Sequence, residues 1–199
     1  MRFPDPSLGL LETSSIAAGV RVADEVLKAA SVHLVEAAPV SPGKFLVIFT
    51  GGVAEVEASL EAGRRRAAGY LVDELLLARV HAAVAPALAP EGLADVGEAI
   101  GVVESLSVAS AIVGADAAAK AARVVLLEIG PGRGIGGKGF FTVTGDVAAV
   151  EAAVEAGRVP IAERGYHLHT EVLAGPHERL VARLRRPLLG SFGRGEDAE

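Results

Sequence analysis

The chain has 199 residues, 51% hydrophobic but only 4% aromatic, enough for one large domain or two of about 100 residues with Ala-, Val- and Leu-rich cores. Its net charge of −6 argues against a general nucleic-acid binder, and its lack of cysteine excludes disulfides, thiolate metal sites, cysteine-ligated iron–sulfur clusters and a cysteine nucleophile. It shows no signal peptide and no apolar run of about 20 residues, so we expect a soluble, cytoplasmic protein without membrane or nucleic-acid partners.

The first half of the chain recurs in the second half. Residues 8–30 and 100–122 share 9 identities in 23 positions, and residues 43–63 and 137–157 share 12 in 21. The offset is 92 residues in the first block and 94 in the second, so the second copy carries two extra residues between the blocks. The predicted domains are residues 1–92 and 93–199, with a disordered tail at 190–199.

In chain order, each copy is predicted to contain a strand, a helix, two strands, a second helix, a fourth strand and a short closing helix. The first helix begins at a Ser/Thr cluster that can cap it and carries Lys28 or Lys120 in its last turn. The order β-α-β-β-α-β is that of the ferredoxin-like unit, an α+β fold with an antiparallel four-stranded sheet and flanking helices. The predicted strands are 8–11, 32–35, 45–50 and 70–75, and 100–103, 124–127, 140–144 and 166–172.

The glycine-rich stretch GPGRGIGGKG at residues 130–139 fits the start of the phosphate-binding pattern G-x-x-x-x-G-K-[ST]. That pattern needs a Ser or Thr after the lysine and then a helix, whose N–H groups meet the phosphate. Here Gly139 follows Lys138 and leads into a predicted strand, and the first copy has the same Gly-Lys pair at Lys44 before a strand. A nucleotide site is therefore disfavoured, and the pair marks a loop-to-strand junction.

Three motifs occur together in both copies: E-T/S-x-S, A-D-x-x-x-K-A-A and T-G-x-V-A-x-V-E-A-x-x-E-A-G. This combination resembles the bacterial microcompartment (BMC) shell domain, and the resemblance covers nearly the whole chain twice. Two copies in one chain resemble the tandem-domain shell proteins that form trimers. The copies begin at the strands that end in Glu12 and Glu104, which is similar to the unpermuted members of the family.

The resemblance implies a structural, non-enzymatic role without a cofactor. Three chains would form a pseudo-hexagonal disc that tiles edge to edge with other shell proteins, both hexamers and pentamers. Small metabolites, anions among them, would cross a central pore lined by the loop between the second and third strands of each copy. The implied pore residues are Val40, Ser41, Pro42, Gly43, Arg133, Gly134, Ile135 and Gly136.

Arg133 is the charged residue of these loops, and its orientation has two possible consequences. Three Arg133 side chains facing a threefold axis would form a positive ring, which favours anions and repels cations. Alternatively, Arg133 turns outward and pairs with a carboxylate such as Glu128. The sequence leaves both orientations open.

The resemblance also implies contacts at the edge of the disc. Lys28 and Lys120 align with the edge lysine of the family, a role compatible with stabilising a helix C-terminus. The Arg-Pro-His edge motif is only partly present. The first copy keeps Arg79 and His81, whereas the second keeps His177 but has Gly in place of Arg, which leaves open whether all six edges are equally strong.

Other candidate sites are weaker. His167 and His169 share one face of a predicted strand, but no third metal ligand accompanies them. Glu12 and Glu104 recur at strand ends without a partner for acid–base catalysis, so a backbone or cap hydrogen bond is favoured. We expect no metal and no catalytic residue. The alternatives are a small-molecule-binding regulator made of two ferredoxin-like domains, and an enzyme that uses the glycine loop on a phosphorylated substrate.

Overall fold

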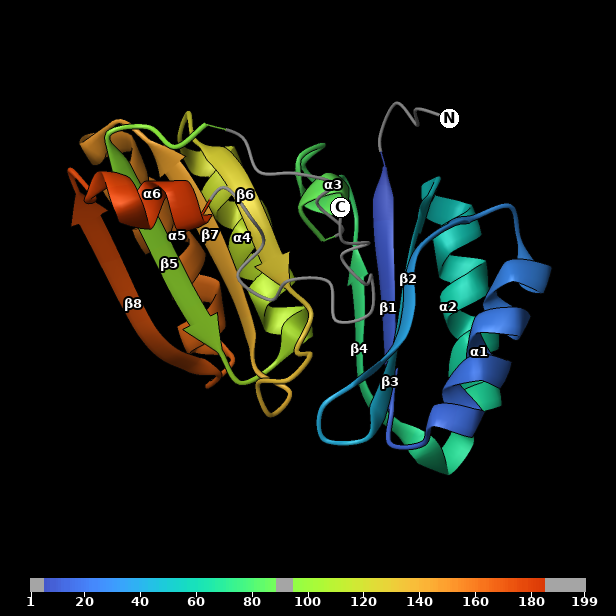
Figure 1. Ribbon diagram of the computed structural model, residues 1–199. Coiled ribbons are helices and arrows are strands. Elements are labelled where there is room, and N and C mark those ends of the chain that lie inside the picture. Colours follow the sequence, from blue (N-terminus) through green and yellow to red (C-terminus); the bar gives the residue numbers. More distant parts are fainter. Residues whose placement is uncertain (1–5, 89–94, 185–199) are drawn as a thin grey trace, which may run out of the picture.

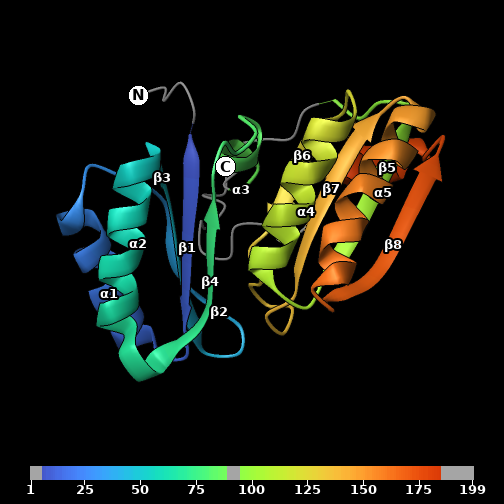
Figure 2. The same ribbon diagram turned by 180° about the vertical axis from the view of Figure 1, so that it is seen from behind.

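The computed structural model describes residues 6–88 and 95–184, which form two α+β units of the same topology (Figures 1 and 2). The first unit comprises β1 (Ser7–Thr13), α1 (Ile16–Ala29), β2 (His33–Val40), β3 (Lys44–Gly51), α2 (Val53–Ala67), a 3-10 turn (Ala68–Tyr70), β4 (Leu71–Leu77) and α3 (Val84–Leu88). The second comprises β5 (Ala99–Ser105), α4 (Val108–Ala121), β6 (Val125–Gly130), β7 (Gly139–Gly145), α5 (Val147–Glu163), β8 (His167–Ala174) and α6 (Glu178–Leu184).

Each unit has an antiparallel four-stranded sheet, in the order β2-β3-β1-β4 or β6-β7-β5-β8. The predicted fold class is thereby confirmed. The predicted domain junction between residues 92 and 93 and the predicted tail at 190–199 lie outside the described residues.

The second strand is longer than predicted. It continues past residue 35 to Val40, because Pro39 and Val40 remain paired with Phe45 and Lys44 of β3. Pro39 is tolerated there because β2 is the edge strand of its sheet, where one row of backbone N–H groups needs no partner. Val40 therefore ends a strand instead of lying within the loop.

The repeated sequence motifs explain how each pair of long helices begins and packs. Ser15 and Ser107 cap α1 and α4, because each side-chain oxygen accepts a hydrogen bond from a backbone N–H three residues later, at 3.3 and 3.4 Å. The glycine of the repeated Glu-Ala-Gly sequence lets the two helices meet. A Cβ at Gly157 would lie 2.7 Å from the carbonyl oxygen of Gly114 in α4, so only glycine allows this approach.

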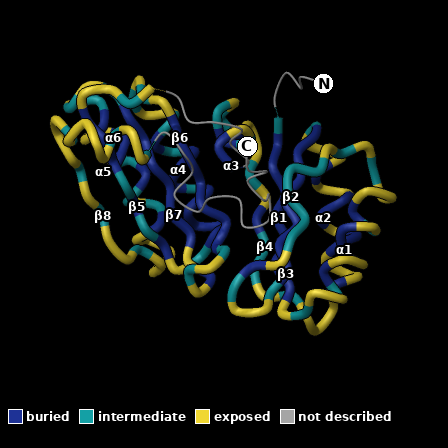
Figure 3. Tube along the Cα trace, in the orientation of Figure 1, coloured by how far each residue is buried: buried dark blue, intermediate teal, exposed yellow. Residues whose placement is uncertain are grey.

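The two faces of the first sheet are covered by different units. Helices α1 and α2 cover one face, and the other face lies toward α4 of the second unit (Figures 1 and 2). Leu8, Leu10 and Ile48 of the first sheet are fully buried in one cluster with Val108 and Ile112 of α4. Figure 3 shows the buried strands between the units. Because burying each leucine contributes about 1.5–3 kcal/mol, this contact between the two units, called the joint below, stabilises the protein.

The end of α2 contains a backbone conformation that suits glycine. Ala68 has φ 47° and ψ −126°, a region that costs a residue with a Cβ about 1–3 kcal/mol. We expect Ala68→Gly to raise the free energy of unfolding by about 1 kcal/mol in urea denaturation. Ala67→Gly is the matched control. Because Ala67 is helical, its replacement by glycine should lower the free energy of unfolding by about 1 kcal/mol. If Ala68→Gly were no more stable than the parent, the backbone of Ala68 would not be strained.

Candidate functional site

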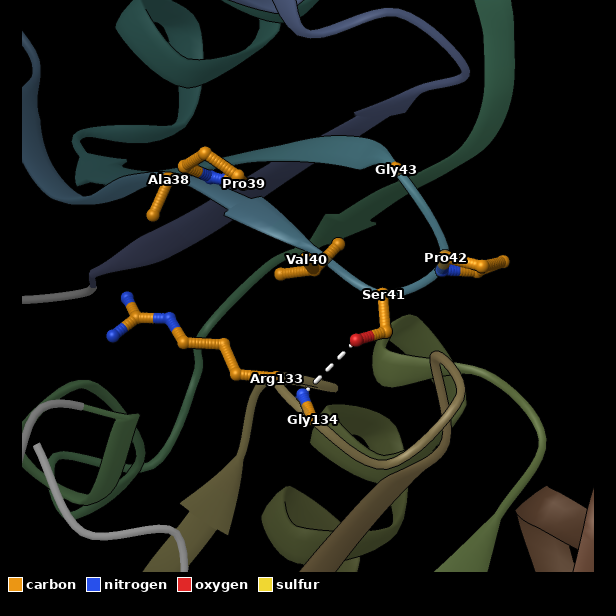
Figure 4. A pocket seen from close by; sticks show the side chains of 8 residues that line it. All are labelled: Ala38, Pro39, Val40, Ser41, Pro42, Gly43, Arg133 and Gly134. Atoms are coloured by element: carbon orange, nitrogen blue, oxygen red, sulfur yellow. Dashed lines mark hydrogen bonds between the residues drawn. The ribbon is translucent and has the colours of Figure 1, made fainter. Parts of the chain in front are cut away.

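The loops expected to line a pore lie side by side at one end of the two units. The turn after β2 and the loop between β6 and β7 border an open hollow of about 600 Å³ (Figure 4). Six of the eight predicted pore residues line it, whereas Ile135 and Gly136 belong to the same loop but are not among the lining residues. The lining residues are Ala38, Pro39, Val40, Ser41, Pro42, Gly43, Arg133 and Gly134.

Hydrogen bonds join the two loops. The backbone N–H of Gly134 donates to Ser41 Oγ at 3.0 Å, and the N–H of Ser41 donates to the carbonyl of Gly132 at 3.4 Å. Gly137 has φ 82°, and a Cβ there would lie 2.7 Å from the carbonyl oxygen of Ser41. Glycine is therefore required where the loop of the second unit crosses that of the first.

Arg133 forms an ion pair between the two units. Its side chain extends away from Ser41 and Pro42 (Figure 4), and its Nη2 pairs with the carboxylate of Glu36 in β2. Glu36 and Glu128 occupy equivalent positions in the two copies. The carboxylate named from the sequence was therefore at the right position but in the wrong copy, since sequence alone does not show which unit faces this loop.

The repeated Gly-Lys pairs place a lysine beside the glutamate at the end of the first strand. Lys44 Nζ lies 2.9 Å from Glu12 Oε1, and Lys138 Nζ lies 3.7 Å from Glu104 Oε2. Both glutamates thus form ion pairs with lysines, which sequence reasoning did not anticipate when it favoured a backbone or cap hydrogen bond. The lysine has a structural partner in both copies, which accounts for the Gly-Lys pairs without a phosphate.

The two lysines expected at the disc edge make the same contact in both copies. Lys28 and Lys120 each lie 2.6 Å from the aspartate one turn earlier, Asp24 or Asp116. The hydrogen bond that the Lys28 ammonium donates to Asp24 raises the pKa of Lys28 above its ordinary value, so this ammonium stays charged at neutral pH.

His81 and His177, the histidines of the expected edge motif, accept the same kind of hydrogen bond. Nδ1 of His81 and of His177 accepts a backbone N–H two residues later, at 3.3 and 3.2 Å. Arg79 and Gly175 both have a positive φ, of 52° and 59°. The replacement of Arg by Gly in the second copy therefore occurs where the backbone itself favours glycine.

The paired histidines of β8 bond to side chains of their own strand. His167 Nε2 lies 2.7 Å from Thr170 Oγ1, and His169 Nε2 lies 2.9 Å from Glu171 Oε1. Within residues 6–88 and 95–184, no three His, Asp or Glu side chains are placed to hold a metal ion. In the same ranges, no helix is both long and apolar enough to cross a membrane.

The repeated unit corresponds to a known domain. Residues 7–80 and 99–176 each match the family described as the BMC domain. The chain belongs to the BMC domain family. Over 174 residues, 87% of this chain and 95% of the relative, it is 38% identical to the bacterial microcompartment shell protein PduT of Citrobacter freundii. It is therefore a bacterial microcompartment shell protein with two BMC domains in tandem, as the sequence motifs predicted.

Solved structures and single-domain relatives agree with this assignment. A crystal structure of a microcompartment protein from Desulfitobacterium hafniense is 46% identical, with a TM-score of 0.85, and the match covers 88% of this chain and 97% of that one. A fused permuted hexameric shell protein shares only the fold, at 20% identity and a TM-score of 0.58. The carboxysome shell protein CcmK2 of Synechococcus elongatus is 38% identical over 79 residues, 38% of this BMC chain and 78% of the relative.

The ion pair between Arg133 and Glu36 should stabilise the contact between the BMC domains. Both side chains are partly exposed, so we expect Glu36→Gln to lower the free energy of unfolding by about 1 kcal/mol in urea. Glu57→Gln, on the exposed face of α2, should change it by less than about 0.5 kcal/mol. The swap Glu36→Arg with Arg133→Glu should recover part of the loss. Equal effects of Glu36→Gln and Glu57→Gln would contradict the contribution of the pair.

Proposed function

We propose that three chains form a ring, a pseudo-hexagonal disc of six BMC domains that tiles into the microcompartment shell as a non-enzymatic structural subunit. The observation that carries this proposal is the joint between the two units of one chain. Residues of that joint in α4 and α3 have counterparts in α1 and α6 that are exposed at the two ends of the chain. A second copy can therefore repeat the joint at each end.

The first helices show this difference most clearly. Ile112 of α4 is 0% exposed because the sheet of the first unit covers it, whereas its counterpart Val20 in α1 is 55% exposed. Val108 and Ile16 form a second such pair, at 1% and 45%. The α1 helix thus carries an apolar stripe of the kind that an interface covers.

A hydrogen bond of the joint has the same kind of open counterpart. The backbone N–H of His81 donates to Asp116 Oδ1 at 2.7 Å. The side chain of Asp116 is 7% exposed, whereas that of its counterpart Asp24 is 60% exposed. Since His177 is built like His81, the ring would place its N–H against Asp24 of the next chain.

The short closing helices repeat the pattern. Val84 of α3 is 0% exposed, and α3 contacts β6 and α4 of the second unit. Its counterpart Leu180 in α6 is 39% exposed. A head-to-tail contact of this type either closes into a ring or continues as a filament, and pseudo-sixfold symmetry with two units per chain closes at three chains.

The ring would bring the loops around the hollow to a common axis. Ser41, Pro42 and Gly43 from the first domain and the loop of residues 131–138 from the second would then border the pore. Because Arg133 pairs with Glu36, the passage would carry three compensated ion pairs instead of three free cations. Small polar metabolites would cross it, and anions would gain less from Arg133 than a bare ring provides.

The outer edge of each disc would meet other shell proteins, hexamers and pentamers among them. The candidate edge contacts are Lys28, Lys120, Arg79, His81 and His177. Lys28 and Lys120 remain exposed in the chain, as an edge contact requires.

The test is the assembly state of Val20→Glu, which places a carboxylate in the apolar stripe. Light scattering should give about 61 kDa for the parent, three times the 20.2 kDa of one chain, and flat hexagonal layers should form in the electron microscope at high concentration. Val20→Glu should be monomeric at micromolar concentration and form no layers, because burying an unpaired charge is costly.

Ala58→Glu is the matched control. Ala58 and its counterpart Ala152 are both exposed on the second helices, so this variant should remain a trimer. If Val20→Glu remained a trimer, the proposed contact between the α1 stripe and a neighbouring chain would be wrong. A parent trimer that never forms layers would contradict the proposed tiling of the disc.

A further inference from the structure

The joint between chains differs in chemistry from the joint within the chain. We infer that an ion pair between Glu171 of one chain and Arg21 of the next chain holds the joint between chains, at the position where the joint within the chain has the apolar residues Leu75 and Val113. This inference rests on the ring proposed above. It concerns which surfaces of two copies recognise each other, and it is argued from positions that differ between the two domains.

The strand register shows which residues of β4 and β8 are equivalent. Leu75 pairs with Leu10 of β1, and Glu171 pairs with Val102 of β5, the residue that repeats Leu10. Leu75 is buried in the cluster shared by the two units. The position that presents a leucine to α4 within the chain therefore presents an exposed glutamate from β8.

The helix that would receive β8 carries the complementary change. Helices α1 and α4 have 14 residues each and are capped by Ser15 and Ser107, so Arg21 is the counterpart of Val113. Val113 is partly buried and packs against the shared cluster. Arg21 is exposed and exceeds valine in length by enough to reach across the joint.

Two contacts within the chain locate Val113 beside β4. Ser107 Oγ donates to Asp73 Oδ2 at 2.7 Å, and the N–H of His81 donates to Asp116 Oδ1 at 2.7 Å. Val113 lies one turn before Asp116 on α4, and Leu75 lies between Asp73 and His81 along the chain. The same placement between chains brings the carboxylate of Glu171 to the guanidinium of Arg21.

The groups around the pair are consistent with this contact. His169, the counterpart of Asp73, bonds to Glu171 in the isolated chain, and Asp24, one turn after Arg21, is already paired with Lys28. Because Lys28 neutralises Asp24, Glu171 is the carboxylate that remains for Arg21 in the joint. An excess of negative charge at this position favours a guanidinium over the valine of the other helix.

The apolar pair Leu75 and Val113 and the charged pair Glu171 and Arg21 also disfavour contacts between two first domains or between two second domains. If the first domain of one chain met the first domain of another, Leu75 would cover Arg21 and leave a guanidinium without a carboxylate. If two second domains met, Glu171 would lie against Val113. Each mismatch buries an unpaired charge, which costs several kcal/mol, so first and second domains must alternate around the ring.

Charge reversal tests the pair. Glu171→Arg and Arg21→Glu should each raise the concentration at which the trimer dissociates at least tenfold, measured by analytical ultracentrifugation at low salt. The double variant should recover most of this loss, because the two charges again have opposite signs. Both side chains are exposed in the single chain, so the variants should fold, which circular dichroism checks.

Glu151→Arg provides the control, because Glu151 and its counterpart Glu57 are exposed on the second helices, and it should leave dissociation unchanged. A double variant no better than the weaker single variant would overturn the pair, while a trimeric parent that Val20→Glu disrupts would leave the ring intact. A monomeric parent would overturn both the ring and the pair.

Discussion

The outer face of a sheet covered by helices on one side must find another partner, and the rest of this structure depends on how that need is met. Leu8, Leu10 and Ile48 lie on the sheet face away from α1 and α2 and are buried in one cluster with Val108 and Ile112 of α4 in the second domain. Tandem duplication thus supplies the cover for one sheet within the chain. In the proposed ring, the exposed stripe of α1 covers the sheet of a neighbouring chain.

Duplication lets the two halves of one joint diverge. In a ring of identical single domains every joint must be the same, whereas the proposed ring of tandem chains has one joint within each chain and another between chains. Leu75 and Val113 lie at the first, and in the proposed ring Glu171 and Arg21 occupy their positions at the second. The loops of the two domains also differ. The loop of the second domain carries Arg133, which pairs with Glu36 of the first domain. The loop of the first domain is shorter and leads directly into Lys44.

Sequence alone predicted the fold because the internal repeat gives each element twice. It missed the full length of β2, where Glu36, Ala37 and Ala38 carry no apolar alternation and only pairing with β3 maintains the strand. It also missed the partner of Arg133, since Glu36 lies 97 residues away in the chain. Sequence alone also did not explain the Gly-Lys pairs, because the ion pairs of Lys44 with Glu12 and of Lys138 with Glu104 depend on the folded sheet.

The absence of cysteine allows the ring closure itself to be measured. Asp24→Cys combined with His177→Cys places one thiol on each side of the proposed joint, and a short bismaleimide should link neighbouring chains. The account predicts that a denaturing gel resolves covalent trimers as the largest product, because the third link closes the ring. A ladder that continues past three chains, or no product above one chain, would contradict it.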